Sequence, residues 1–156
     1  MSETTELAEK LKTEGQKMTD FFAALADDQW QAEVYTEGAT WTVRMVLSHF
    51  VTSERGLVTL FERIRQGGEG VTDDFSIDRY NARQQEKTRE LTPQELLEQY
   101  QSMRAESVAW VSGLQEPELE KTGRHPFLGQ TTLREMVKML YIHNQLHYRD
   151  LKRVLK

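Results

Sequence analysis

Apolar side chains recur at three- and four-residue intervals in four long segments of this chain, and no other sequence feature constrains its fold as strongly. That spacing places the apolar side chains on one face of an α-helix, so each segment predicts an amphipathic helix with one side to bury. The first predicted helix covers roughly residues 4–26, and the other three begin at threonine residues that can cap a helix.

The predicted caps also indicate where the later helices end. Thr40 can cap the second helix, which should end at Gly67 because glycine commonly terminates helices. Thr92 is followed by Pro93 in the first turn and by Glu95, with which it forms a capping box, and its helix should end at about residues 113–116. Thr132 forms a second capping box with Glu135 and opens a helix that runs to the C-terminus.

The segments between these helices show neither a helical nor a strand period. We expect irregular connections over residues 29–39 and 123–129, and a short helix after Ser76 in the polar linker 69–90, laid across one end of the bundle. Four long helices without alternating strands predict an all-α, up-and-down four-helix bundle. Because a chain of this length can bury one core, residues 1–156 are expected to form a single domain.

Charge and composition narrow the classes of partner. The net charge of −5 opposes non-specific attraction to nucleic acid, so we expect no nucleic-acid partner. No stretch approaches the ~20 apolar residues of a membrane span, and the acidic start without an apolar run predicts a cytoplasmic protein. The absence of cysteine excludes thiolate ligands and a cysteine nucleophile. The cations near the C-terminus are interpreted as complementing a helix dipole; they are Arg149, Lys152, Arg153 and Lys156.

His143 and His147 stand four residues apart in the last predicted helix. On a helix both imidazoles project from one face, about one turn apart. Five apolar residues fall within roughly 60° of His143 at ~100° per residue. The pair and Asp150 are therefore predicted to lie near the middle of the buried stripe, where neutral imidazoles are good metal ligands. The five apolar residues are Met136, Met139, Leu140, Leu146 and Val154.

His49 lies on the second predicted helix, ~100° from Phe50 at the flank of the apolar stripe. From there it can face the other two histidines or the solvent edge. Up-and-down order makes the second and fourth helices parallel, and at ~1.5 Å per residue His49 then lies about one turn below the pair. That offset is within reach of side chains, so the geometry permits three histidines to meet.

Three converging imidazoles would suit Zn²⁺, Ni²⁺, Fe²⁺ or Cu²⁺ and would leave a coordination position open. A catalytic zinc can lower the pKa of its water to about 7, or activate an external thiol as thiolate. A lone histidine on an apolar face is more often a core residue satisfied by a hydrogen bond. The interpretation as a metal site therefore depends on all three residues meeting.

Other polar residues near these positions allow several roles. Asp150 can orient an imidazole, supply a fourth ligand, or pair with the arginines and lysine beside it, and these alternatives stay open. His125, beside Pro126, is predicted to be a surface or turn histidine, with lining of the site mouth as the alternative. Ser53 and Glu54 are interpreted as packing and solvated residues and not as catalysts.

Four motifs along the chain share the pattern of one known family: Trp41-Thr-Val-Arg-Met-Val-Leu-Ser-His49, Tyr80-Asn81, His125-Pro-Phe-Leu-Gly-Gln-Thr-Thr-Leu133 and His143-x-x-x-His147. Together they resemble the DinB/YfiT-like metalloenzyme superfamily over nearly the whole chain. The resemblance implies a four-helix bundle of mirrored up-and-down hand and a metal held by His49, His143 and His147, with Asp150 and Asn81 as candidates for supporting it. Relatives include transferases and isomerases that use mycothiol or bacillithiol, many members have no known activity, and dimers are common, so a homodimer is expected.

The leading hypothesis is a metal-dependent enzyme whose three-histidine site holds Zn²⁺ or Ni²⁺ and acts on a small electrophile. It would be a low-molecular-weight-thiol-dependent S-transferase or a hydrolase with a small-molecule substrate. The rival is a non-catalytic metal-binding or stress-response protein. A catalytic site should keep an exchangeable position and an apolar pocket, whereas a structural site would be closed by a fourth protein ligand such as Asp150.

Overall fold

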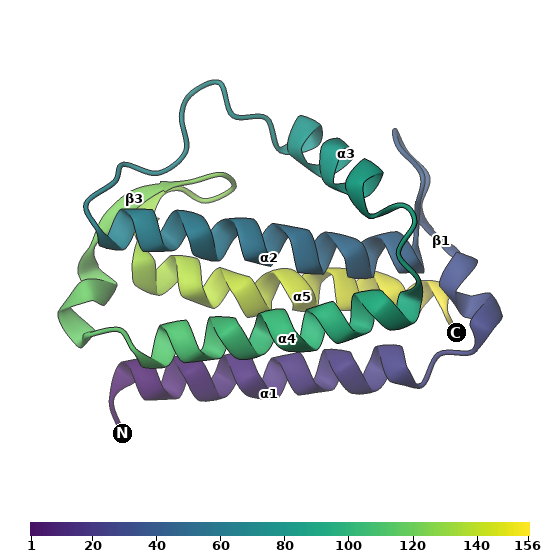
Figure 1. The fold of residues 1–156 in the computed structure, drawn as a ribbon, viewed down its shortest axis with the longest axis horizontal. Helices are drawn as coiled ribbons and strands as arrows, with labels where there is room; N and C mark the ends of the chain where they lie inside the picture. Colours follow the sequence, from purple (N-terminus) through teal and green to yellow (C-terminus); the bar gives the residue numbers. More distant parts are fainter.

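The computed structural model describes residues 1–156 and places four long helices side by side (Figure 1). A fifth helix, α3 (Ile77–Thr88), lies in the long connection between the second and third of them. The predicted all-α four-helix bundle with a short extra helix in this linker is confirmed. None of the helices combines the length and the apolar character that crossing a membrane requires. The four bundle helices are α1 (Glu3–Ala23), α2 (Val43–Arg65), α4 (Pro93–Ser112) and α5 (Leu133–Val154).

Side-chain caps explain where three of these helices begin. Thr92 accepts a hydrogen bond from the backbone N–H of Glu95, whose carboxylate accepts one from the N–H of Thr92, as the sequence predicts. Thr132 caps α5 through the backbone N–H three residues later. The cap of α2 is Thr42 and not Thr40. The helix starts later than predicted because the residues before it belong to a strand.

Two short β-hairpins occupy segments that we expected to be irregular. Each follows a single 3₁₀ helix, η1 (Asp27–Gln31) or η2 (Glu116–Glu120), and leads directly into the next long helix. Strands this short carry too few side chains to show an alternating pattern, so their sequence signal is weak. The antiparallel pairs are β1 (Glu33–Tyr35) with β2 (Trp41–Thr42), and β3 (Thr122–His125) with β4 (Gly129–Thr132).

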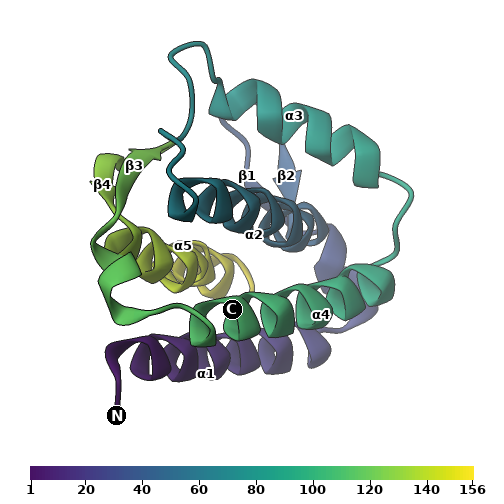
Figure 2. The ribbon, with the colours of Figure 1, turned by 60° about the vertical axis from the view of Figure 1, so that its left-hand side comes forward.

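Helices α2 and α5, which carry the three histidines, run antiparallel and not parallel as expected (Figure 1). Phe61 near the end of α2 shares a core cluster with Leu133 at the start of α5. Val43 at the start of α2 shares the other cluster with Leu151 near the end of α5. The physical reason is the long connection through α3, which returns the chain to the end of the bundle where α2 began, so α4 runs parallel to α2 (Figure 2).

Helix α3 packs along the outer side of α2 and does not cross an end of the bundle as expected (Figure 2). The side-chain amide of Gln85 donates to the carbonyl of Met45 at 2.8 Å. The hydroxyl of Tyr80 donates to the carbonyl of Thr52 at 3.0 Å. These two acceptors lie about two turns apart on α2. Helix α3 therefore covers one face of the N-terminal half of α2.

An ion pair between Arg104 of α4 and Glu54 of α2 lies in the core. The guanidinium donates to both carboxylate oxygens, at 2.9 and 2.6 Å, and Glu54 is 3% exposed and not solvated as we interpreted it. Arg104 also donates to the carbonyl of Leu11 and to the side-chain oxygen of Asn144, which accepts from Tyr100 as well. Every buried charge here has partners, and the network joins all four bundle helices.

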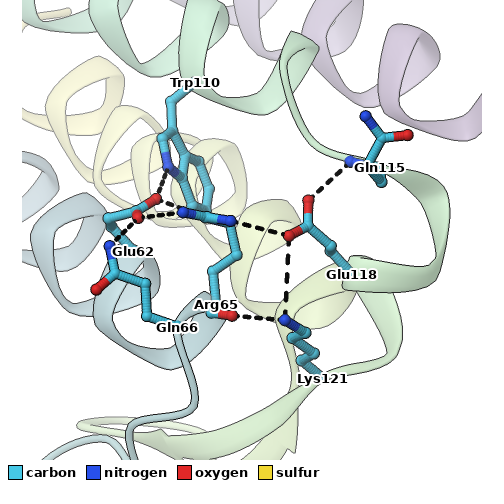
Figure 3. A network of polar contacts seen from close by, with 7 residues as sticks. All are labelled: Glu62, Arg65, Gln66, Trp110, Gln115, Glu118 and Lys121. Carbon is cyan, nitrogen blue, oxygen red and sulfur yellow. Dashed lines mark hydrogen bonds and ion pairs between the residues drawn. The ribbon is translucent and has the colours of Figure 1, made fainter.

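A second polar network fastens the C-terminal end of α2 to the segment that follows α4 (Figure 3). Glu62 accepts from the indole of Trp110 at 2.8 Å and from Arg65 at 2.6 Å. Arg65 also donates to Glu118 at 3.0 Å, and Lys121 donates to the carbonyl of Arg65 at 2.6 Å. These bonds hold η2 against α2 and so set the position from which the β3–β4 hairpin starts.

We expect the substitution Glu54→Ala to lower the free energy of unfolding by about 3–5 kcal/mol, because it leaves the Arg104 charge buried without its partner. Urea denaturation measures the loss. The control is Lys138→Ala, which removes an exposed pair with Glu135 and should cost less than about 1 kcal/mol. Equal losses in the two variants would contradict the structural role of the buried pair.

Candidate metal centre

The side chains of His49 from α2 and of His143 and His147 from α5 meet inside the bundle. The Nε2 atom of His143 lies 2.9 Å from Nε2 of His49 and 3.1 Å from Nε2 of His147. One ligand atom from each ring lies within 4.8 Å of the others. In a tetrahedral site with Zn–N bonds of about 2.0–2.1 Å the nitrogens lie ~3.3 Å apart. The three rings therefore stand close to the separation that a bound metal ion needs.

The two α5 histidines lie at the edge of the buried face of the helix and not in its middle. Leu146 and Val154, which the angular count placed on the buried face, are 41% and 36% exposed. Asn144, 2% exposed, lies within the core instead. The buried face is rotated toward Asn144 because that side chain joins the network around Arg104. The rotation leaves both imidazoles half-buried.

Tyr35 of strand β1 connects His147 to Asp150. Its hydroxyl oxygen lies 2.7 Å from Nδ1 of His147 and 2.6 Å from a carboxylate oxygen of Asp150, to which it donates. The hydroxyl has one proton, so Nδ1 of His147 is the donor to the tyrosine oxygen. This tautomer leaves the lone pair on Nε2, the atom that faces the other two rings.

Asp150 lies behind His147 and not among the converging ligand atoms, which belong to the three histidines. Its carboxylate accepts from Tyr35 and from Arg153, the latter at 3.1 Å. The sequence left three roles open for Asp150. The structure shows its pairing with a neighbouring cation, Arg153, and an indirect contact with the imidazole of His147 through Tyr35. Sequence reasoning missed Tyr35, because it lies in a segment that we expected to be irregular.

Aromatic side chains hold the imidazole rings on their core side. The ring centroid of Trp41 lies 4.9 Å from that of His49. The centroid of Phe50 lies 5.9 Å from that of His143 and 5.7 Å from that of His147. These contacts restrict rotation of the rings and keep water away from that side of the cluster.

Burial lowers the pKa of each imidazole in the cluster. The pKa of His49 lies well below its usual value because of desolvation first, and then because of the nearby His143 and His147. Burial, followed by the neighbouring His147 and His125, lowers the pKa of His143 to about 3. Burial also lowers the pKa of His147, although Asp150 opposes the shift. All three rings are therefore uncharged at neutral pH, which is the form that binds metals.

A cavity of about 380 Å³ opens beside the rings of His49 and His143. Its volume suits a small molecule. Ser53 of α2 and Asn81 of α3 contribute polar atoms to its wall, so Asn81 faces the cavity beside the cluster and is not one of the converging groups. Most of the surface that the cavity wall exposes is apolar, and the apolar side chains in it include Leu57, Leu60, Val71, Phe75, Ile77 and Met139.

His125 is buried and lines this cavity, contrary to the prediction of a surface or turn histidine. It is 3% exposed, and burial lowers its pKa to about 4. The pairing of β3 with β4 folds this residue over α2, where its ring lies 6.0 Å from that of Phe61. The alternative reading, in which it lines the mouth of the site, is the one that the structure supports.

The sequence matches the family model of the DinB superfamily over residues 10–151. The chain therefore belongs to this superfamily. No curated protein sequence matches it.

Solved structures share the fold at low sequence identity. YfiT from Bacillus subtilis, described as a probable metal-dependent hydrolase with an unusual four-helix bundle topology, has a TM-score of 0.77 and 17% identity over 99% of this chain and 87% of its own. An uncharacterised protein from Escherichia coli UTI89 has a TM-score of 0.76 and 13% identity, with 97% and 91% covered. The colibactin self-resistance protein ClbS has a TM-score of 0.74 and 13% identity, with 100% and 99% covered.

The expectation that a chain of this kind has no nucleic-acid partner is wrong, because the structure of ClbS was solved in complex with double-stranded DNA. The net charge of −5, on which that expectation depended, sums over the whole chain. A sum of charges does not describe a local surface, and a bundle of this fold can present a patch that differs in sign from the total.

We expect the metal-free protein to lose stability as the pH falls from about 6.5 to about 5. The folded-state pKa values of His125 and His143 are about 4 and about 3, below the value of histidine in an unfolded chain. As the pH falls, the histidines therefore take up protons first in the unfolded chain, which favours unfolding. Their contribution to the free energy of unfolding is complete above pH ~6.5 and is lost as the pH falls toward the folded-state pKa values. Urea midpoints at several pH values measure the effect, and His143→Gln should reduce the slope. A midpoint that stays constant over this range would contradict the shifts.

Proposed function

We propose that this chain is a metal-dependent enzyme that acts on a small electrophile, with His49, His143 and His147 holding Zn²⁺ or Ni²⁺. The observation that carries the proposal is the convergence of three uncharged imidazoles, two of which, His49 and His143, line a largely apolar cavity. The description of YfiT as a probable metal-dependent hydrolase supports hydrolysis as the reaction. Transfer of a low-molecular-weight thiol to the electrophile is the alternative within the same class.

The donor set fits a divalent cation. Lone pairs on nitrogens that lie 2.9 and 3.1 Å apart repel one another unless a proton or a cation lies between them. Three imidazoles are ligands that zinc and nickel accept, and they leave room for a further ligand. When bound, the metal would act as a Lewis acid and lower the pKa of a water or thiol toward neutrality.

The protein's own residues orient this site and shape the space beside it. Tyr35 and Asp150 hold His147 in the tautomer whose Nε2 is free. Trp41 and Phe50 exclude water from the core side of the rings. The apolar cavity walls would bind the body of the substrate with its reactive group directed toward His143.

A structural or non-catalytic metal site would be closed by a fourth protein ligand. Asp150 was the candidate for that position, but its carboxylate is held by Tyr35 and Arg153. A cavity of about 380 Å³ lies beside the cluster in place of a fourth ligand. These two observations favour an enzyme over the rival class.

His143→Ala should abolish stoichiometric metal binding, since it removes the ring whose Nε2 lies between the other two. Elemental analysis of protein purified without a histidine tag tests this. Wild-type protein should release its metal only as the pH falls well below 6, because burial lowers the pKa of the metal-free imidazoles, to about 3 for His143. His125→Asn, which changes a histidine outside the cluster, is the control and should retain the metal.

The same variants test the reaction. Hydrolysis of uncharged esters and lactones should be lost in His143→Ala and after treatment with a chelator, and kept in part by the control. A requirement for an added thiol would indicate the transferase alternative. Undiminished metal content in His143→Ala would refute the site assignment.

Tyr35→Phe should weaken metal binding about 10- to 100-fold without abolishing it, because the hydroxyl that holds His147 is removed while the ring remains. Competition with a chelator of known affinity measures the change. Tyr141→Phe, on the same helix as the histidines and away from the cavity lining, is the matched control and should have no effect. An unchanged affinity in Tyr35→Phe would show that this contact does not support the site.

A further inference from the structure

The hydrogen bonds of His125 determine where its ring carries a proton. Its Nδ1 atom accepts from the backbone N–H of Phe127 at 3.0 Å and from that of Leu128 at 3.1 Å. A nitrogen that accepts two N–H groups carries no proton of its own, so the neutral ring is protonated on Nε2. His125 therefore presents an N–H donor from the edge of the ring opposite the hairpin turn.

That donor is buried and has no partner within the protein. The Nε2 atom of His125 makes no hydrogen bond, although the residue is 3% exposed. Buried donors in folded proteins are nearly always paired, because an unpaired donor loses its hydrogen bonds to water without replacement. His125 lines the same cavity as His49 and His143, and its Nε2 atom is covered in this structure, so a bound molecule that displaces the covering side chains can supply the missing acceptor.

The surroundings indicate which acceptor fits. The residues that line the cavity include one side chain with a full charge, Arg63, and that residue is exposed at the C-terminal end of α2. The interior is uncharged and largely apolar. An ionised carboxylate would lose its hydration there and gain one neutral donor, which does not compensate the cost. An uncharged carbonyl oxygen loses little and gains a directed hydrogen bond.

We propose that His125 is a substrate-binding residue whose Nε2–H donates to the carbonyl oxygen of a small, uncharged and mainly apolar substrate. The inference rests on the proposed function in one respect: it names the substrate class for the reaction at the three neighbouring histidines. Binding of the carbonyl group itself needs no metal, so it can be tested on metal-free protein.

His125→Asn separates the two roles of the ring. An asparagine side-chain oxygen can accept backbone N–H groups two residues ahead, as Nδ1 of His125 does, so the turn is retained. The shorter side chain has no group at the position of Nε2, so the Nε2–H donor is lost. Thermal unfolding and metal content of the variant should therefore stay close to those of the wild type.

The test uses two probes of nearly equal shape, acetophenone and α-methylstyrene, in which a C=O group is replaced by C=CH₂. Binding to metal-free wild-type protein is followed by NMR titration, which also detects the Nε2–H resonance of His125. We expect acetophenone to bind about tenfold more tightly than α-methylstyrene and to shift this resonance. In His125→Asn the two probes should bind with equal affinity.

Four results would overturn the proposal. Three of them are equal binding of both probes to the wild type, a preference for acetophenone that survives in His125→Asn, and no saturable binding of acetophenone. The fourth is an NMR titration that shows Nδ1 of His125 protonated in the wild type. Because the protein carries no metal in this experiment, its failure is distinct from failure of the metal site, which elemental analysis of His143→Ala reports.

Discussion

The buried guanidinium of Arg104 sets how α2 lies against α5, and the histidine cluster depends on that placement. It bonds to Glu54, five residues after His49, and to Asn144, the residue after His143. A shift of one helix by one turn would move it ~5.4 Å, which would separate the rings and leave a buried charge unpaired. The same bonds that stabilise the core therefore hold the imidazoles at their separations of 2.9 and 3.1 Å.

The two short hairpins supply the parts of the site that the long helices do not. The β1–β2 hairpin precedes α2 and carries Tyr35, which reaches across to His147 on α5. The β3–β4 hairpin precedes α5 and carries His125 over α2. The hairpin before α2 thus contributes a side chain that contacts α5, and the hairpin before α5 contributes one that contacts α2. The hydrogen bonds of both side chains fix which atom carries the proton.

Membership in the DinB superfamily describes the scaffold, and the solved structures that share it differ in what they are described as doing. A common fold can host different sites, so the substrate preference of the proposed enzyme depends on its own cavity. That cavity has a largely apolar interior, a buried N–H donor at His125 and one cation, Arg63, at its exposed end. These features would favour a substrate by its shape and its acceptor oxygen more than by its charge.

The sequence by itself determined the four long helices, the caps at Thr92 and Thr132, and the shared helix face of His143 and His147, because these follow from local spacing and capping chemistry. Only the tertiary structure decided that α2 and α5 are antiparallel and that Tyr35 and His125 face the site. Periodicity reports which face of a helix is apolar but not which helix covers it. Contacts between residues that are distant in sequence decide how the helices pair, and the local spacing of apolar residues does not reveal those contacts.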